Sequence, residues 1–137
     1  RPDGLSLAFD IKTLNAASIV KKNWQNMIND LATEATTVHS RFPNAIVAFM
    51  VIVPGPCISG SRLAAMTGTL ERLASRTDIA DPAFRAEAIS LVIWYPESGQ
   101  IDSSIPDPAS PLRIEHFSEQ VELVYRARYK GLPPHAE

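Results

Sequence analysis

The stretch AIVAFMVIV, at residues 45–53, is apolar throughout and rich in valine and isoleucine. A short apolar run that lacks the alternation of a half-buried strand is typical of a strand covered on both faces. Pro54, Gly55 and Pro56 follow the stretch and end it. The stretch therefore predicts a central strand of an α/β sheet.

A long amphipathic helix is predicted before this strand, over residues 17–41. Its apolar residues recur at steps of three and four and form one stripe. They are Val20, Trp24, Met27, Ile28, Leu31, Ala35 and Val38. Pro43 ends the helix, because proline has no backbone N–H to donate and its ring clashes with the preceding turn.

A strand with one covered face is predicted before the helix, where residues 5–12 read LSLAFDIK. Apolar and other side chains alternate there with the period of two that a half-buried strand requires. The residues expected to face the core are Leu5, Leu7, Phe9 and Ile11. Asp10 and Lys12 then share the opposite, polar face of the strand.

The second half of the chain continues the same order of elements. We expect a helix over residues 61–76, an apolar strand over residues 88–95, a loop over residues 96–111 and a helix over residues 117–129. Strands joined through helices are parallel neighbours in the sheet. The fold class is therefore α/β, with helices on both faces of a central sheet.

Composition limits the class of protein. The 137 residues suffice for one domain, residues 1–137, and the net charge of −2 gives no sign of a nucleic-acid or membrane partner. No apolar run approaches the ~20 residues that span a bilayer. Cys57 is the single cysteine, which excludes an internal disulfide and favours a reducing, cytoplasmic compartment.

Two short segments near the start of the chain carry a recognisable pattern. Residues 1–4 read RPDG and residues 9–12 read FDIK, and a long helix and a buried strand follow them. The pattern resembles the PD-(D/E)XK nuclease family, which includes type II restriction endonucleases. Pro2 and Asp3 match the "PD" element, and Asp10, Ile11 and Lys12 match "(D/E)XK". The likeness covers about the first 53 residues and implies a three-layer, restriction-endonuclease-like fold with a central mixed sheet.

The resemblance implies a Mg²⁺-dependent endodeoxyribonuclease, with Mn²⁺ as a substitute for Mg²⁺. Asp3, Asp10 and Lys12 are the expected catalytic residues. The carboxylates of Asp3 and Asp10 and the backbone carbonyl of Ile11 would bind the metal, because magnesium prefers hard oxygen ligands. The Lys12 ammonium would stabilise charge that develops on the phosphate. Asp3 and Asp10 can meet one cation only if the chain reverses between them, and Gly4 permits such a turn.

The expected partner is double-stranded DNA, with Lys21, Lys22 and Gln25 contacting phosphates from the polar face of the helix. A two-fold dimer would suit a palindromic target. Because the chain starts at Arg1 in a segment like the middle of a domain, we expect a fragment that lacks its N-terminal part. Two alternatives stay open: a non-catalytic DNA-binding or assembly domain of the same fold, and a small-molecule enzyme that uses Asp10 and Lys12 in proton transfer.

Overall fold

The computed structural model describes residues 4–14, 17–58 and 60–129, with the backbone alone for residues 17–22. Four strands form one mixed sheet in the order β1-β2-β3-β4. β1 (Leu7–Thr13), β2 (Ile46–Pro54) and β3 (Ala88–Tyr95) are parallel, and β4 (Gln100–Ile101) is antiparallel to β3. The predicted parallel neighbours are confirmed, and β4 lies within the segment that the sequence predicted to be a loop.

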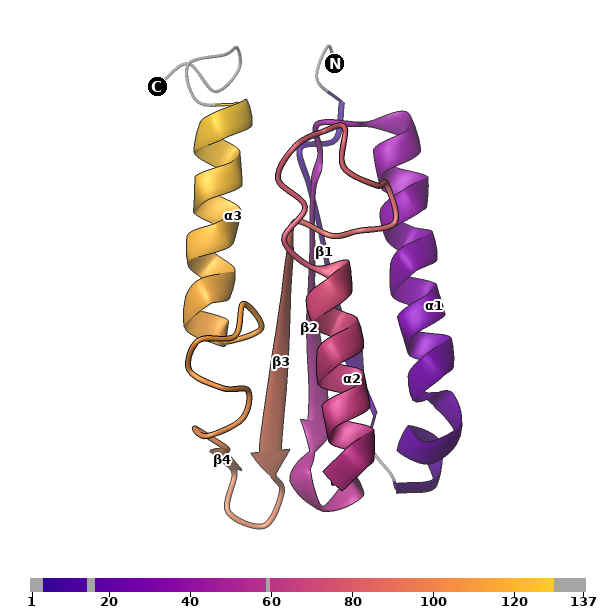
Figure 1. Ribbon diagram of the computed structural model, residues 1–137, viewed down its shortest axis with the longest axis vertical. Helices are drawn as coiled ribbons and strands as arrows, with labels where there is room; N and C mark the ends of the chain where they lie inside the picture. Colours follow the sequence, from indigo (N-terminus) through magenta and orange to yellow (C-terminus); the bar gives the residue numbers. More distant parts are fainter. Residues whose placement is uncertain (1–3, 15–16, 59, 130–137) are drawn as a thin grey trace.

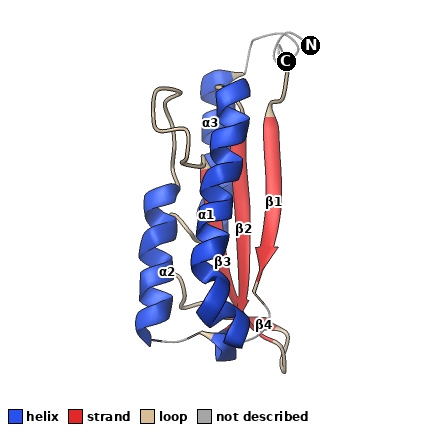
Figure 2. Ribbon diagram, turned by 90° about the vertical axis from the view of Figure 1, so that its right-hand side faces the viewer, coloured by secondary structure: helices blue, strands red, loops and turns tan. Residues whose placement is uncertain are grey.

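In the described part of the chain, three α-helices flank the sheet: α1 (Ala17–Arg41), α2 (Gly60–Leu73) and α3 (Ile114–Arg128). A short 3₁₀ turn, η1 (Gly55–Cys57), follows β2 where the proline pair ends the strand. α1 and α2 lie on one face of the sheet and α3 on the other (Figures 1 and 2). The α/β class with helices on both faces is therefore confirmed, and α3 begins three residues before the start predicted for it.

The main core lies between the sheet and the pair α1 and α2. Alternate residues of β2 enter it, and they are Val47, Phe49, Val51 and Val53. Leu31 and Ala35 of α1 and Met66 and Leu70 of α2 meet them, all of them buried. A smaller cluster under α3 contains Ile46, Val124 and Tyr129. β2 thus contributes to both clusters, as its continuous apolar sequence predicted.

β1 lies at one edge of the sheet, and one prediction about its side chains is wrong. The side chains of Leu7, Phe9 and Ile11 point away from α1 and remain 48–50% exposed, whereas they were expected to enter the core. Leu5 is also exposed, and it is Ala8 that packs against the main core. The reason is that α3 lies over β3 and β2 and contacts β1 little, so that most of this face of β1 has no covering layer.

Candidate functional site

Asp10 and Lys12 face α1, where Glu34 meets them. The Nζ of Lys12 lies 3.1 Å from Oδ2 of Asp10 and donates a hydrogen bond of 3.1 Å to Oε1 of Glu34. The Lys12 side chain is 26% exposed, and both carboxylates are more open to solvent. The Asp10 and Glu34 oxygen atoms that contact Nζ are therefore at most twice 3.1 Å apart. We call these three residues the acid–lysine cluster.

The acid–lysine cluster forms because the side chains of β1 alternate between two faces and because α1 packs over one of those faces. Asp10 and Lys12 are two residues apart, so both point to the same face of β1. α1 returns over that face, and Glu34 lies beside its buried stripe next to Ala35. Sequence predicted that Asp10 and Lys12 share a face, but that face was expected to lie opposite the core, and it faces α1 instead. Glu34 was considered from sequence only as a surface carboxylate or a supporting group.

The open edge of β1 exposes backbone groups next to this cluster. The carbonyl of Ser6 and the N–H of Leu14 are bonded to β2, so the even-numbered residues of β1 direct their backbone groups inward. The N–H of Ile11 instead donates to Oδ1 of Asp10 at 2.9 Å. Since the N–H and C=O of a strand residue point to the same side, the Ile11 carbonyl also points to the open edge.

Lys12 and Asp10 stabilise each other's charged forms. The hydrogen bond from Lys12 lowers the pKa of Asp10, against a smaller opposing effect of burial. Burial tends to lower the pKa of Lys12, but the bonds to Glu34 and Asp10 outweigh it and raise that pKa. Both groups are therefore charged at neutral pH, and Lys12 acts as a cation rather than as a base.

A polar pocket of about 340 Å³ continues from the cluster toward the end of β1. Its wall consists of Lys12, Thr13, Leu14, Asn23, Asn26, Met27 and Asp30. Asn23, Asn26 and Asp30 are spaced by three and four residues and so share one face of α1. We call them the α1 polar row. This spacing was visible in the sequence, but Asp30 was not singled out, because apolar residues dominate the pattern of the helix.

Several residues predicted from sequence lie elsewhere or outside the described part of the chain. Asp3 is outside the described residues, as are the side chains of Lys21 and Lys22. Gln25 is exposed on α1 and does not line the polar pocket. Gly4 has φ +55, and a Cβ there would lie 2.5 Å from the Phe42 ring, so this position requires glycine, but residues 4–10 show no turn before or within β1. The convergence of Asp3 and Asp10 stays a prediction.

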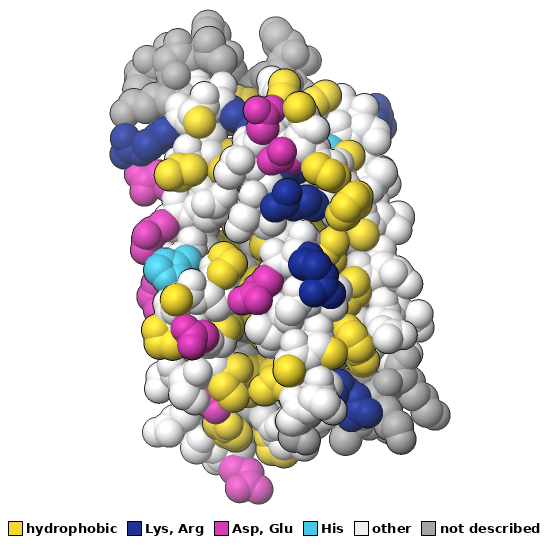
Figure 3. All heavy atoms as spheres, viewed as in Figure 1, with side chains coloured by type: hydrophobic (Ala, Val, Ile, Leu, Met, Phe, Trp, Pro, Cys, Tyr) yellow, Lys and Arg dark blue, Asp and Glu magenta, His cyan; other side chains and the backbone are white. Residues whose placement is uncertain are grey.

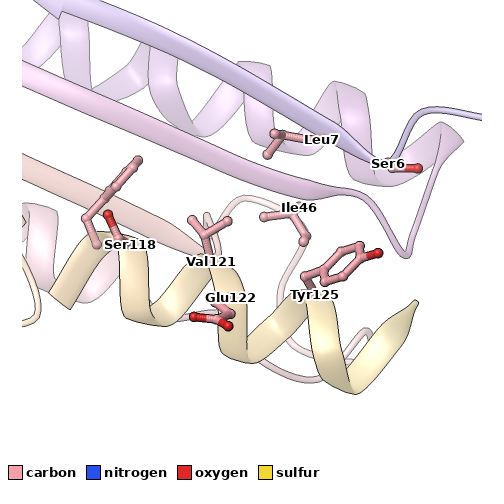
Figure 4. Close-up of a pocket in the computed structure, with 8 residues that line it drawn as sticks. Ser6, Leu7, Ile46, Ser118, Val121, Glu122 and Tyr125 are labelled. Carbon is pink, nitrogen blue, oxygen red and sulfur yellow. The ribbon is translucent and has the colours of Figure 1, made fainter. Parts of the chain in front are cut away.

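A second groove, of about 490 Å³, lies between β1 and α3 (Figure 4). Leu7 and Ile46 form its floor, and Val121 and Tyr125 of α3 form its wall. Its few polar groups include Glu122, which is paired with Arg126 at 2.8 Å. The groove therefore offers apolar surface and little that is suited to catalysis.

A buried ionic cluster around Glu87 lies at the opposite end of the sheet. Oε1 of Glu87 lies 2.9 Å from Nε2 of His39 and accepts the N–H of Val47 at 2.8 Å. Oε2 of Glu87 accepts bonds from Arg76 at 2.6 Å and from Arg128 at 2.8 Å. The Glu87 carboxylate is fully buried. Burial would raise its pKa, but its hydrogen bonds, with that to His39 the largest, lower it.

The charges on the face in Figure 3 show no broad patch of one sign among the described residues. Acidic and basic side chains are interspersed over α2 and α3 in that view. The acid–lysine cluster belongs instead to β1 and α1.

Comparisons with protein-family models, with curated proteins and with solved structures found no match. In the described part of the chain, no three or more His, Cys, Asp and Glu side chains are grouped so that they could hold a metal ion. No described helix has both the length and the apolar character needed to cross a bilayer. The function must therefore be inferred from the site itself.

Proposed function

We propose that this chain carries the catalytic site of a metal-dependent endodeoxyribonuclease that hydrolyses phosphodiester bonds in double-stranded DNA. One observation carries the proposal: Lys12 lies between two carboxylates, Asp10 on its own strand and Glu34 on the facing helix. A lysine beside exposed carboxylates suits phosphodiester hydrolysis, because that reaction needs both a cation site and a donor to the phosphate. The resemblance of residues 1–12 to the PD-(D/E)XK pattern supports the same chemistry.

The proposed cation is a magnesium ion, held by oxygen ligands of the kind that magnesium prefers. Magnesium usually binds one or two protein carboxylates and keeps water and substrate phosphate oxygens as its other ligands. Asp10 and Glu34 supply two carboxylates, and Oε2 of Glu34 has no hydrogen-bond partner although it is shielded from solvent. The carbonyl of Ile11, at the open edge of β1, is a further hard oxygen. These residues would hold the cation, and Asp3 is a proposed additional ligand.

Each residue of the proposed site would have a separate role in hydrolysis. When bound, the metal would activate a water molecule and neutralise charge on the phosphate. Asp10 and Glu34 would hold that cation in place of the lysine that they now bind. Lys12, released from the carboxylates, would donate N–H bonds to the phosphate oxygen on which charge grows. A lysine has an ordinary pKa of about 10.4 and is therefore protonated near neutral pH, as this role requires.

The same pKa directions argue against a proton-transfer enzyme. A general acid or base works best with a pKa near the operating pH. The pKa of Asp10 is lowered and that of Lys12 is raised, so both are displaced further from neutrality. Metal-free proton transfer by this pair is therefore the weaker hypothesis. Divalent-metal binding separates the catalytic proposal from a purely assembling or DNA-binding domain.

Replacing Asp10 with alanine should abolish binding of Mg²⁺ and Mn²⁺, because one of the two described carboxylates of the site is lost. Isothermal titration calorimetry with MnCl₂ measures this directly. Asp78→Ala is the matched control, since Asp78 is an exposed aspartate in the loop after α2 and should leave metal binding unchanged. Equal Mn²⁺ affinity in wild type and Asp10→Ala would show that the metal does not bind at this site.

A further inference from the structure

The polar pocket next to the acid–lysine cluster has wall residues that the proposed hydrolysis does not use. Asn23 and Asn26 present two carboxamides that have no hydrogen-bond partner among the described residues. Lys12 stands on the border between the pocket and the cluster, and the hydroxyl-bearing Thr13 follows it. The pocket thus joins the proposed reaction centre to two uncharged donors, Asn23 and Asn26, and to the carboxylate of Asp30.

We infer that this pocket binds the DNA phosphate that neighbours the bond to be cut. This inference rests on the proposed function and names the part of the substrate that the pocket takes. Carboxamide N–H groups donate to phosphate oxygens, and such contacts fix the position of the duplex without reading its sequence. The pocket opens beside Lys12, so a phosphate held there would be a neighbour of a phosphate at the acid–lysine cluster.

Asp30 adds a negative charge to the wall of the pocket. Its carboxylate lies on the same wall as the two carboxamides and carries a charge of the same sign as a phosphate. A phosphate in the pocket is therefore attracted by Asn23 and Asn26 and repelled by Asp30. A cation or the amino group of a base would instead be attracted by all three side chains. The substitutions in this row should therefore change phosphate binding in opposite directions.

The test uses thymidine 3′,5′-bisphosphate as the probe and the full chain without metal. NMR titration follows the side-chain amide signals of Asn23 and Asn26, which should shift as the probe binds. The double substitution Asn23→Ala and Asn26→Ala should weaken binding of the probe roughly tenfold or more, because two hydrogen bonds to a charged group are lost. Asp30→Asn should strengthen binding of the probe by about fivefold. This is the effect expected in water when one charge of the same sign is removed from a distance of about 4 Å.

Asn29→Ala is the matched control, because Asn29 is an exposed asparagine of α1 that does not line the pocket. It should bind the probe as the wild type does. An unshifted wild-type spectrum, an unaffected double variant or a weaker Asp30→Asn variant would each overturn the inference. DNA cleavage by the wild type with Mg²⁺ is measured separately. A chain that cuts DNA but fails the titration disproves the pocket alone, and a chain that never cuts DNA disproves the proposed function.

Discussion

Replacing Glu87 with alanine is expected to cost about 3–5 kcal/mol of unfolding free energy, the range for removing one partner of a buried ion pair. The carboxylate is the common partner of Arg76, Arg128 and His39, and it has no solvent exposure. Without it, buried cations face one another with no counter-charge. The loss is a large share of the 5–15 kcal/mol that typically stabilises a domain. Urea unfolding followed by circular dichroism gives the difference directly.

Two further variants separate charge from packing. Glu122→Ala removes an exposed i, i+4 pair with Arg126 and should change stability by less than about 0.5 kcal/mol. Glu87→Gln keeps the size of the side chain and removes only its charge. Should Glu87→Ala and Glu122→Ala prove equally stable, the buried cluster would not hold the fold together.

The lowered pKa of Glu87 also predicts how stability depends on pH. A carboxyl whose pKa is lower in the folded state stabilises the fold above its usual pKa of about 4.5. This stabilisation decreases as the pH falls below that value and is lost when the pH passes through the lowered pKa. Unfolding free energy measured from pH 7 to pH 2 should fall more steeply in the wild type than in Glu87→Gln. Parallel curves would contradict this role for the ionised carboxylate.

Lys12→Ala is expected to slow DNA cleavage by ~10²–10³ while DNA affinity stays within a few-fold of the wild type. Losing one preorganised electrostatic donor typically costs about 3–4 kcal/mol of transition-state stabilisation. The effect belongs to the reaction, because charge grows on the phosphate only as the bond breaks. DNA affinity instead comes from many contacts to phosphates spread over the surface. Single-turnover cleavage with Mg²⁺ and gel-shift binding measure the two quantities separately.

Arg126→Ala is a suitable control for this experiment, since it removes an exposed cation from α3, which lies on the other face of the sheet from α1 (Figures 1 and 2). Its cleavage rate should equal that of the wild type. Cleavage by Lys12→Ala at the wild-type rate would show that Lys12 is only the partner of Asp10 and Glu34 in an ion pair. A variant that lost DNA binding and cleavage together would show that Lys12 acts in the ground state.

The order of elements was predictable because local sequence determines it. The continuous apolar run of β2 indicated a strand covered on both faces, and the stripe that includes Leu31 and Ala35 indicated a helix of the observed length. The alternation in β1 identified two faces correctly. It did not show which face would be covered, since that depends on where α3 lies. Phe9 is half exposed because β1 is at the edge of the sheet, and its own sequence does not show this position.

Half of the candidate site could be predicted in the same way. Asp10 and Lys12 share a face through the geometry of the strand alone. Glu34 is 22 residues from Lys12 and meets it only because α1 returns over β1. The Glu87 cluster was not predictable either, since its partners His39 and Arg128 come from helices far apart in the sequence.

The alignment of β1 with β2 decides whether the candidate site exists at all. Bonds from Ile46 to Ser6 and from Leu14 to Ile52 fix the two ends of the strand. A slip by one residue would turn every side chain of β1 to the other face. Leu7, Phe9 and Ile11 would then enter the interior, while Asp10 and Lys12 would leave Glu34. The hydrogen bonds at the two ends of the strand therefore hold Asp10 and Lys12 on the face where Lys12 meets Glu34.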